Sequence, residues 1–317
     1  MVTSEWWYRL ARMEELLGRD DVARAAYREA LDVDSDNPAF LFSMLETTPQ
    51  QNFIHRQPIA RFVVDHLSAI HARAQSAPPT VAELDRPVFV YWGQGFALAP
   101  SVVQTCVARL RSVVPADRLH LPTMDTVRYY ADLPAPVWKL AETDQAHFSD
   151  VLRAALLARY GGSWLDATCF TGPGFLDEVD RLADAEYFAF RYQTPKISSW
   201  FMTSTLGGYV ARQLDAALRV YWDTHSTKQH YFLYHFLFEA LYWADPEFRR
   251  RWDGCPARST RVPHRLQSWM YRSAADVDLE ALIASSFVHK LTWKVRARQM
   301  DPDPVMAALM RRENRWR

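Results

Sequence analysis

The sequence predicts an α/β protein with a mostly parallel sheet flanked by helices, preceded by a small all-helical part. Three observations support this prediction. Apolar runs typical of strands alternate with amphipathic helical segments after Pro87. The first run, VFVYW, ends in Gly93-Gln94-Gly95, as expected where a buried parallel strand meets a ligand-binding loop. In residues 146–170 a helix, a glycine turn and a strand follow one another directly.

Composition and charge place the chain among globular proteins. Hydrophobic residues make up 49% of 317 residues, enough to bury one large core. Lys plus Arg and Asp plus Glu number 37 each, so we expect no nucleic-acid partner. No apolar run approaches the ~18 residues of a membrane span, and the N-terminus lacks a signal peptide. We therefore expect a cytoplasmic protein whose only membrane contact would be peripheral.

Residues 1–76 are expected to form a helical N-terminal region. Helices at 5–18 and 20–33 meet at a Gly18 turn, with a spacing that resembles one tetratricopeptide (TPR) repeat. A single repeat cannot bury its own face. The hairpin is expected to pack on the main domain, or alternatively to dock a partner protein. A further helix is expected at 59–74, and the Pro- and Ala-rich residues 75–87 are expected to form a linker.

The main domain is expected at 86–300, followed by a basic C-terminal tail at 301–317. Its first strand follows Pro87, and Pro100 is placed to open a helix over 101–113. A second strand is expected near 118–121. Later segments predict a strand at 186–191, a strand or loop at 197–205, and helices at 207–222, 231–243 and 279–285.

The stretch 146–170 contains the clearest candidate site. Asp150 and Arg153 are three residues apart on a helix, so they share one face. Gly161-Gly162 is expected to end that helix. In the strand that follows, Asp166 and Thr168 are expected on one face, together with Trp164. A carboxylate at the end of an apolar strand is costly without a partner, which indicates a functional site.

Four segments in the same order resemble bacterial capsular polysaccharide synthesis glycosyltransferases: WGQGFALAP, AHFSDVLRAALLARYGGSWLDAT, YFLYHFLFEAL and HKLTWK. These look related to DXD-containing sugar transferases. The resemblance covers residues 86–294 and implies a GT-A-like, Rossmann-like domain. It also implies a hexosyltransferase that uses a nucleotide-diphosphate sugar, with a UDP-sugar as the expected donor. The acceptor would be a saccharide or glycosylated metabolite, and the reaction would be retaining and assisted by Mn²⁺ or Mg²⁺.

The resemblance assigns catalytic roles to Asp166 and Asp150, with Asp166 at the first aspartate of DXD. Thr168 stands where DXD has its second aspartate and brings no charge, so metal affinity is expected to be low or the metal dispensable. His289 resembles the late-chain residue that completes the metal site with Asp166 and Thr168; a buried core histidine is the alternative.

The remaining assignments concern the donor and the acceptor. The diphosphate leaving group of the donor needs cations close by. Aromatic rings can stack on the nucleotide base of the donor. The residues expected to bind the donor are Trp92, Gly93, Arg153, Gly162, Lys290 and Lys294. Trp200 and His235 are weaker candidates for the acceptor side. For Trp92 a core position is the alternative, and for Asp150 with Arg153 a surface ion pair.

A second function of a different class stays open at this point. The missing second aspartate and the N-terminal hairpin are also what a catalytically weak, glycosyltransferase-like scaffold would show. Such a scaffold would bind a partner protein or a glycan through the TPR-like region.

Overall fold

The computed structural model describes residues 3–33, 53–76, 84–193, 196–294 and 303–313. The contacts divide the chain into two compact units. The first comprises Met1–Pro78 and Arg212–Gly254, and the second comprises Pro79–Ala211 and Cys255–Arg317. The range 86–300 expected for the main domain therefore includes parts of both units. Within the described residues, no helix combines the length and apolar character needed to cross a membrane.

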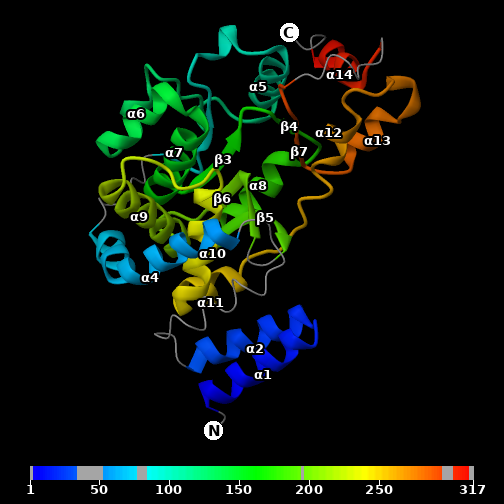
Figure 1. Cartoon of the computed structure of the whole chain (residues 1–317). Coiled ribbons are helices and arrows are strands. Elements are labelled where there is room, and N and C mark those ends of the chain that lie inside the picture. The colour runs from blue at the N-terminus through cyan, green and yellow to red at the C-terminus, as the bar shows by residue number, and fades with distance from the viewer. Residues whose placement is uncertain (1–2, 34–52, 77–83, 194–195, 295–302, 314–317) are drawn as a thin grey trace. The chain divides into compact units, whose positions relative to one another are not determined.

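The second unit is built on a five-stranded sheet with the strand order β2-β1-β3-β6-β5. Figure 1 labels β3, β6 and β5 of this sheet. Its strands are β1 (Val88–Tyr91), β2 (Leu119–His120), β3 (Gly162–Asp166), β5 (Tyr187–Gln193) and β6 (Lys196–Ser204). Strand β1 pairs in parallel with both β2 and β3. Strand β6 runs antiparallel to both β3 and β5. Only β6 therefore opposes the other four strands, which confirms the predicted mostly parallel sheet.

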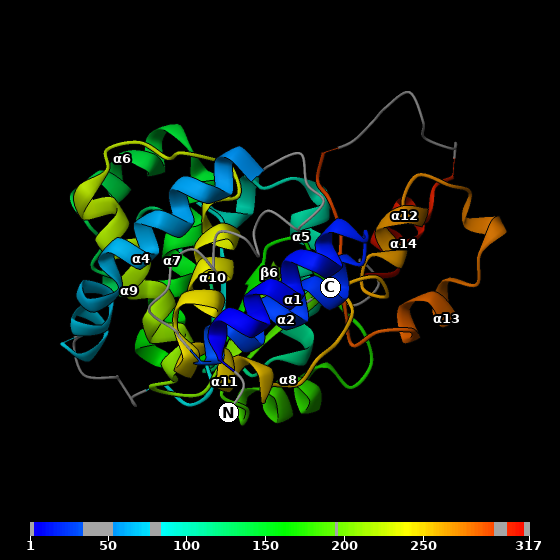
Figure 2. The ribbon, with the colours of Figure 1, turned by 60° about the horizontal axis from the view of Figure 1, so that its bottom comes forward.

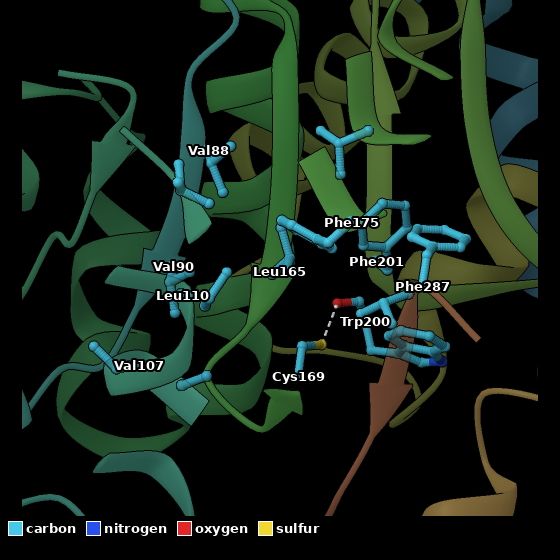
Figure 3. Close-up of a cluster of buried hydrophobic side chains, with 14 of the residues drawn as sticks. Val88, Val90, Val107, Leu110, Leu165, Cys169, Phe175, Trp200, Phe201 and Phe287 are labelled. Carbon is cyan, nitrogen blue, oxygen red and sulfur yellow. Dashed lines mark hydrogen bonds between the residues drawn. The ribbon is translucent and has the colours of Figure 1, made fainter. Parts of the chain in front are cut away.

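Helices cover both faces of this sheet. They include α5 (Ser101–Val113), α6 (Ala135–Thr143), α7 (Gln145–Tyr160) and α8 (Phe175–Ala183). Alternate residues of β1 point to opposite faces. Val88 and Val90 join a buried cluster with α5 and α8 (Figure 3). The ring of Phe89 instead packs against Tyr160 at the end of α7. The sheet is thus apolar on both sides, as expected for buried parallel strands.

Strand β3 ends earlier than the sequence predicts. It stops at Asp166, and the chain turns through Thr168 into β4 (Cys169–Thr171). Strand β4 pairs antiparallel with β7 (Val288–Lys290) in a separate two-stranded sheet. The expectation that Asp166 and Thr168 share one face of one strand is therefore wrong, because the turn breaks the alternation. What brings the two side chains together is β7.

A second buried cluster holds the C-terminal part of the second unit together. The helices here are α12 (Arg265–Trp269), α13 (Leu279–Ala284) and α14 (Val305–Glu313), with the short 3-10 turn η3 (Ala274–Asp276). Two further 3-10 turns, η1 (Phe96–Leu98) and η2 (Val127–Tyr129), follow β1 and β2. Helix α14 lies within the expected tail, and its Val305 and Leu309 pack with Val102 and Cys106 of α5. The basic tail expected at 301–317 thus contains a helix with a buried apolar face.

The first unit is helical throughout its described part. Its helices are α1 (Ser4–Leu16), α2 (Asp20–Val33), α4 (Phe53–Gln75), α10 (Leu233–Ala244) and α11 (Pro246–Asp253), with most of α9 (Tyr209–Thr224). Helices α1 and α2 lie side by side (Figures 1 and 2), which confirms the predicted hairpin. Arg28 of α2 is held by Asp253 at 2.8 Å. The TPR-like character of the hairpin stays a prediction.

Candidate functional site

The candidate site lies where parallel strands β1 and β3 end. Asp166 is the last residue of β3 and is the register partner of Tyr91, the last residue of β1. Trp92 and Gly93 continue beyond that edge. In α/β sheets ligands bind outside the carboxyl ends of parallel strands. Asp166 therefore stands where the fold class places its binding sites.

Arg153 of α7 joins the two carboxylates singled out in the sequence. Its Nη1 lies 3.3 Å from Oδ1 of Asp150, and its Nη2 lies 3.4 Å from Oδ1 of Asp166. The guanidinium also donates to the carbonyl of Ser199 at 2.7 Å and stands 5.2 Å from the ring centre of Trp164. Arg153 is only 5% exposed. The pair with Asp150 is thus part of a buried arrangement rather than a surface ion pair.

Lys290 of β7 completes the arrangement from a distant part of the chain. Its Nζ donates to Oδ2 of Asp166 at 2.6 Å and to Oγ1 of Thr168 at 2.9 Å. The Lys290 side chain keeps 20% of its surface exposed, and that of Asp166 keeps 27%. We call Asp150, Arg153, Asp166 and Lys290 the charged cluster. Its two carboxylates and two cations balance when all four groups are ionised.

The two carboxyl groups of the charged cluster differ in acidity. Burial raises the pKa of Asp150 to about 6, although Arg153 opposes that shift. Burial also acts to raise the pKa of Asp166, but Lys290 and Arg153 outweigh it and lower that pKa below its usual range. Asp166 is therefore an anion throughout the neutral range, whereas Asp150 changes charge near pH 6. Such divergent pKa values are typical of functional sites.

The structure does not bring His289 to Asp166 and Thr168. His289 and Lys290 are neighbours in β7, so their side chains leave opposite faces of the strand. His289 is fully buried, with its Nε2 2.9 Å from the carbonyl oxygen of Ile283. Burial lowers its pKa, which keeps the ring neutral.

A divalent cation does not fit the residues expected to hold it, in the arrangement that the structure shows. Oδ1 of Asp166 accepts from Nε1 of Trp164 at 3.1 Å, and Oδ2 is bonded to Lys290. The Thr168 hydroxyl accepts a hydrogen bond from the same Lys290 ammonium. Across the described residues, no three or more His, Cys, Asp or Glu side chains are grouped to hold a metal. The place beside Asp166 is taken by Lys290.

Trp92 and Gly93 follow β1 directly, at the edge of the sheet where Asp166 ends β3. The ring of Trp92 packs edge-to-face against Trp293, with ring centres 6.1 Å apart. Trp293 is 44% exposed and comes three residues after Lys290. A Cβ on Gly93 would lie 2.8 Å from both the Tyr91 hydroxyl and a Gln145 side-chain oxygen, so a larger residue there would require these side chains to shift. The sequence interpretation missed Trp293, although an aromatic residue between lysines in HKLTWK was an available signal.

The structure gives four other candidates no contact with the charged cluster among the described residues. Gly162 begins β3, about 13 Å along the strand from Asp166 at ~3.3 Å per residue. Trp200 is 5% exposed and stacks on Phe190 inside the buried cluster (Figure 3). Lys294 has an exposed side chain. His235 belongs to α10 of the first unit.

The match to a protein-family model agrees with the resemblance seen in the sequence. No curated protein matches the chain. A solved structure titled "PaToxG Glycosyltransferase" is similar at 13% identity and a TM-score of 0.34, over 62% of this chain and 80% of that one. The family described as "Capsular polysaccharide synthesis protein" matches residues 43–309, which is most of the sequence. The chain therefore belongs to the capsular polysaccharide synthesis protein family.

Proposed function

We propose that the protein is a glycosyltransferase that moves a hexosyl group from a nucleotide-diphosphate sugar, UDP-sugar first among them, to a saccharide or glycosylated metabolite. Family membership supports a role in polysaccharide synthesis. The observation that carries the proposal is the Asp166 carboxylate, held between Arg153 and Lys290 at the carboxyl ends of parallel strands.

The charged cluster offers the two kinds of group that sugar transfer requires. Carboxylates are strong acceptors for sugar and ribose hydroxyls, a role that suits Asp166 and ionised Asp150. The bond from the sugar carbon to the diphosphate oxygen breaks with its electron pair on the diphosphate, so that negative charge grows there. The Lys290 ammonium is placed to stabilise that charge. The acceptor hydroxyl oxygen forms the new bond to the sugar carbon, and its proton passes to the departing diphosphate; we propose a retaining course from the family resemblance.

The aromatic pair beside the cluster suits the nucleotide base. Trp92 packs against half-exposed Trp293, which comes three residues after Lys290, and bases stack on aromatic side chains. The closely packed backbone at Gly93 lies on the same edge of the sheet. We assign these three residues to the nucleotide side of the site.

A panel of nucleotide sugars tests the proposed function. Purified protein is titrated with UDP, GDP and ADP by calorimetry and then incubated with the matching nucleotide sugars, with release of the nucleotide diphosphate as the readout. We expect at least one nucleotide to bind and its sugar donor to be consumed, with Asp166→Asn removing consumption. If none of the nucleotides binds, with or without Mn²⁺, the proposed function is wrong.

Absence of nucleotide binding would favour the alternative function, a scaffold. One observation supports this alternative. Large apolar side chains on the α1–α2 hairpin are about half exposed: Trp6, Met13, Leu17 and Val22. Exposed apolar side chains grouped on one element are typical of protein-docking surfaces. A scaffold would lack nucleotide binding altogether, so the same titration separates the two functions.

A further inference from the structure

We propose that the Lys290 ammonium takes the place of the divalent metal in this site, so that the donor diphosphate is bound without a metal ion. The inference rests on the proposed function, because it concerns how the same donor is held. It follows from three features of the structure: the two bonds made by Lys290, the charge balance at position 168, and the backbone that holds β7.

The Lys290 ammonium stands where the metal of a DXD site would be expected. It bonds the carboxylate of Asp166 and the hydroxyl of Thr168, the two positions that correspond to the motif. An ammonium carries three N–H donors. Among the described residues, Asp166 and Thr168 are the two side chains that accept from it. The third donor is left for a ligand, and the side chain is 20% exposed. A phosphate oxygen is the acceptor that suits a cation of this kind.

Thr168 fits an ammonium better than it fits a divalent cation. Its hydroxyl accepts the Lys290 hydrogen bond without adding negative charge, so the charged cluster stays balanced. An aspartate at 168 would leave the cluster with one excess negative charge. It would also supply the second carboxylate that hard cations prefer. The departure from DXD and the presence of Lys290 are therefore two parts of one arrangement.

The backbone around Lys290 holds the ammonium in place before any ligand arrives. Residue 290 pairs with Cys169 in the β4–β7 sheet, and its backbone N–H donates to the carbonyl of Pro263 at 3.0 Å. The next N–H, of Leu291, donates to the carbonyl of Thr168 at 2.9 Å. The turn that carries Thr168 is thus tied to the strand that carries Lys290. A preorganised cation of this kind stabilises developing charge without reorganisation.

Calorimetry with UDP and UMP, each in EDTA and in Mn²⁺, tests the inference. We expect the UDP affinity of the unaltered protein to change less than threefold between the two conditions. Lys290→Gln should weaken UDP by about 10- to 100-fold, the usual effect of losing a hydrogen bond to a charged group, and UMP much less. Lys290→Arg should retain most UDP affinity. Lys139→Gln, at an exposed lysine of α6 away from the cluster, is the matched control and should bind like the unaltered protein.

A double variant supplies an independent result. Thr168→Asp combined with Lys290→Gln rebuilds the two-carboxylate motif and removes the competing cation. We expect its UDP affinity to rise at least tenfold on adding Mn²⁺. Thermal unfolding of every variant confirms that the comparison is made between folded proteins.

The outcomes separate the inference from the proposed function. If the unaltered protein binds UDP only with Mn²⁺, the inference is overturned while the proposed function stands. Equal weakening of UDP and UMP by Lys290→Gln would also overturn it, because Lys290 would then act only structurally. If no nucleotide diphosphate binds in either condition, the proposed function fails and the inference with it.

Discussion

Nζ of Lys290 lies 2.6 Å from Oδ2 of Asp166, although 124 residues separate them in the chain. The contact joins the end of β3 to β7, and therefore the central sheet to the two-stranded sheet. It keeps Asp166 ionised and places an ammonium at the edge of a parallel sheet. The predictions below start from this pair and its surroundings.

Asp166→Asn should abolish donor turnover while leaving the fold intact. The amide keeps the shape of the carboxylate but removes the charge that Lys290 and Arg153 share. We expect turnover to fall about 100-fold or more, the scale seen when a preorganised charged group is removed from an active site. Nucleotide release measures this. Asp276→Asn, at an exposed aspartate of η3, is the control and should keep normal turnover. Near-normal turnover in Asp166→Asn would show that Asp166 is not part of the active site.

Asp150 should make turnover depend on pH around 6. Burial raises its pKa to about 6, so the carboxylate form that accepts a sugar hydroxyl prevails only above that pH. We expect kcat/KM to rise with pH through this value and Asp150→Asn to lose the step. A profile that is unchanged in Asp150→Asn would assign the step to another group.

Asp150 should also make the stability of the fold depend on pH. Its contribution to the free energy of unfolding falls as pH rises, whereas kcat/KM rises. The folded protein holds the Asp150 proton more tightly than the unfolded chain, whose pKa is near 3.8. The stability that this adds is present below pH 3.8 and is lost as pH rises through about 6. Asp150→Asn should therefore become more stable relative to the unaltered protein between pH 4 and 7, by at most about 3 kcal/mol. Urea unfolding at several pH values measures the difference.

Arg153→Ala should destabilise the second unit strongly. The guanidinium is buried, and its removal leaves Asp150 without the cation that partners it and the Ser199 carbonyl without its donor. Removing one partner of a buried ion pair costs roughly 3–5 kcal/mol. Arg153→Lys should recover part of this, because the charge remains but the planar fork is lost. A loss below about 0.5 kcal/mol in Arg153→Ala would show that the cluster does not depend on it.

Gly162→Ala should cost more stability than Gly174→Ala, although both glycines have positive φ. At Gly162 a Cβ would overlap the carbonyl oxygen of Pro87, in addition to the strain of φ 73°. At Gly174, with φ 67°, nothing lies within 4 Å. We expect about 1–2 kcal/mol for Gly174→Ala, from backbone strain alone, and clearly more for Gly162→Ala. Equal losses would show that the Pro87 contact relaxes freely.

Local patterns made much of this protein predictable. The apolar run after Pro87 and the helical segment that precedes Gly161 form a buried strand and helix, because burial of apolar side chains follows their spacing. Gly161, with φ 64°, ends α7 as expected, since this conformation suits glycine. The pairing of Asp150 with Arg153 also follows from spacing, because both residues lie on one turn of a helix.

The partners of Asp166 depended on tertiary structure. The motif HKLTWK does not show which of His289 and Lys290 faces Asp166. The pairing of β7 with β4 decides this, because it turns Lys290 toward Asp166 and His289 toward Ile283. The turn after β3 likewise moves Thr168 off the strand, where simple alternation fails. The sequence by itself thus identified the family, the sheet and the carboxylate at its edge, because these follow from local spacing and motif order. Which cation stands beside that carboxylate was decided by long-range strand pairing, which local spacing does not encode.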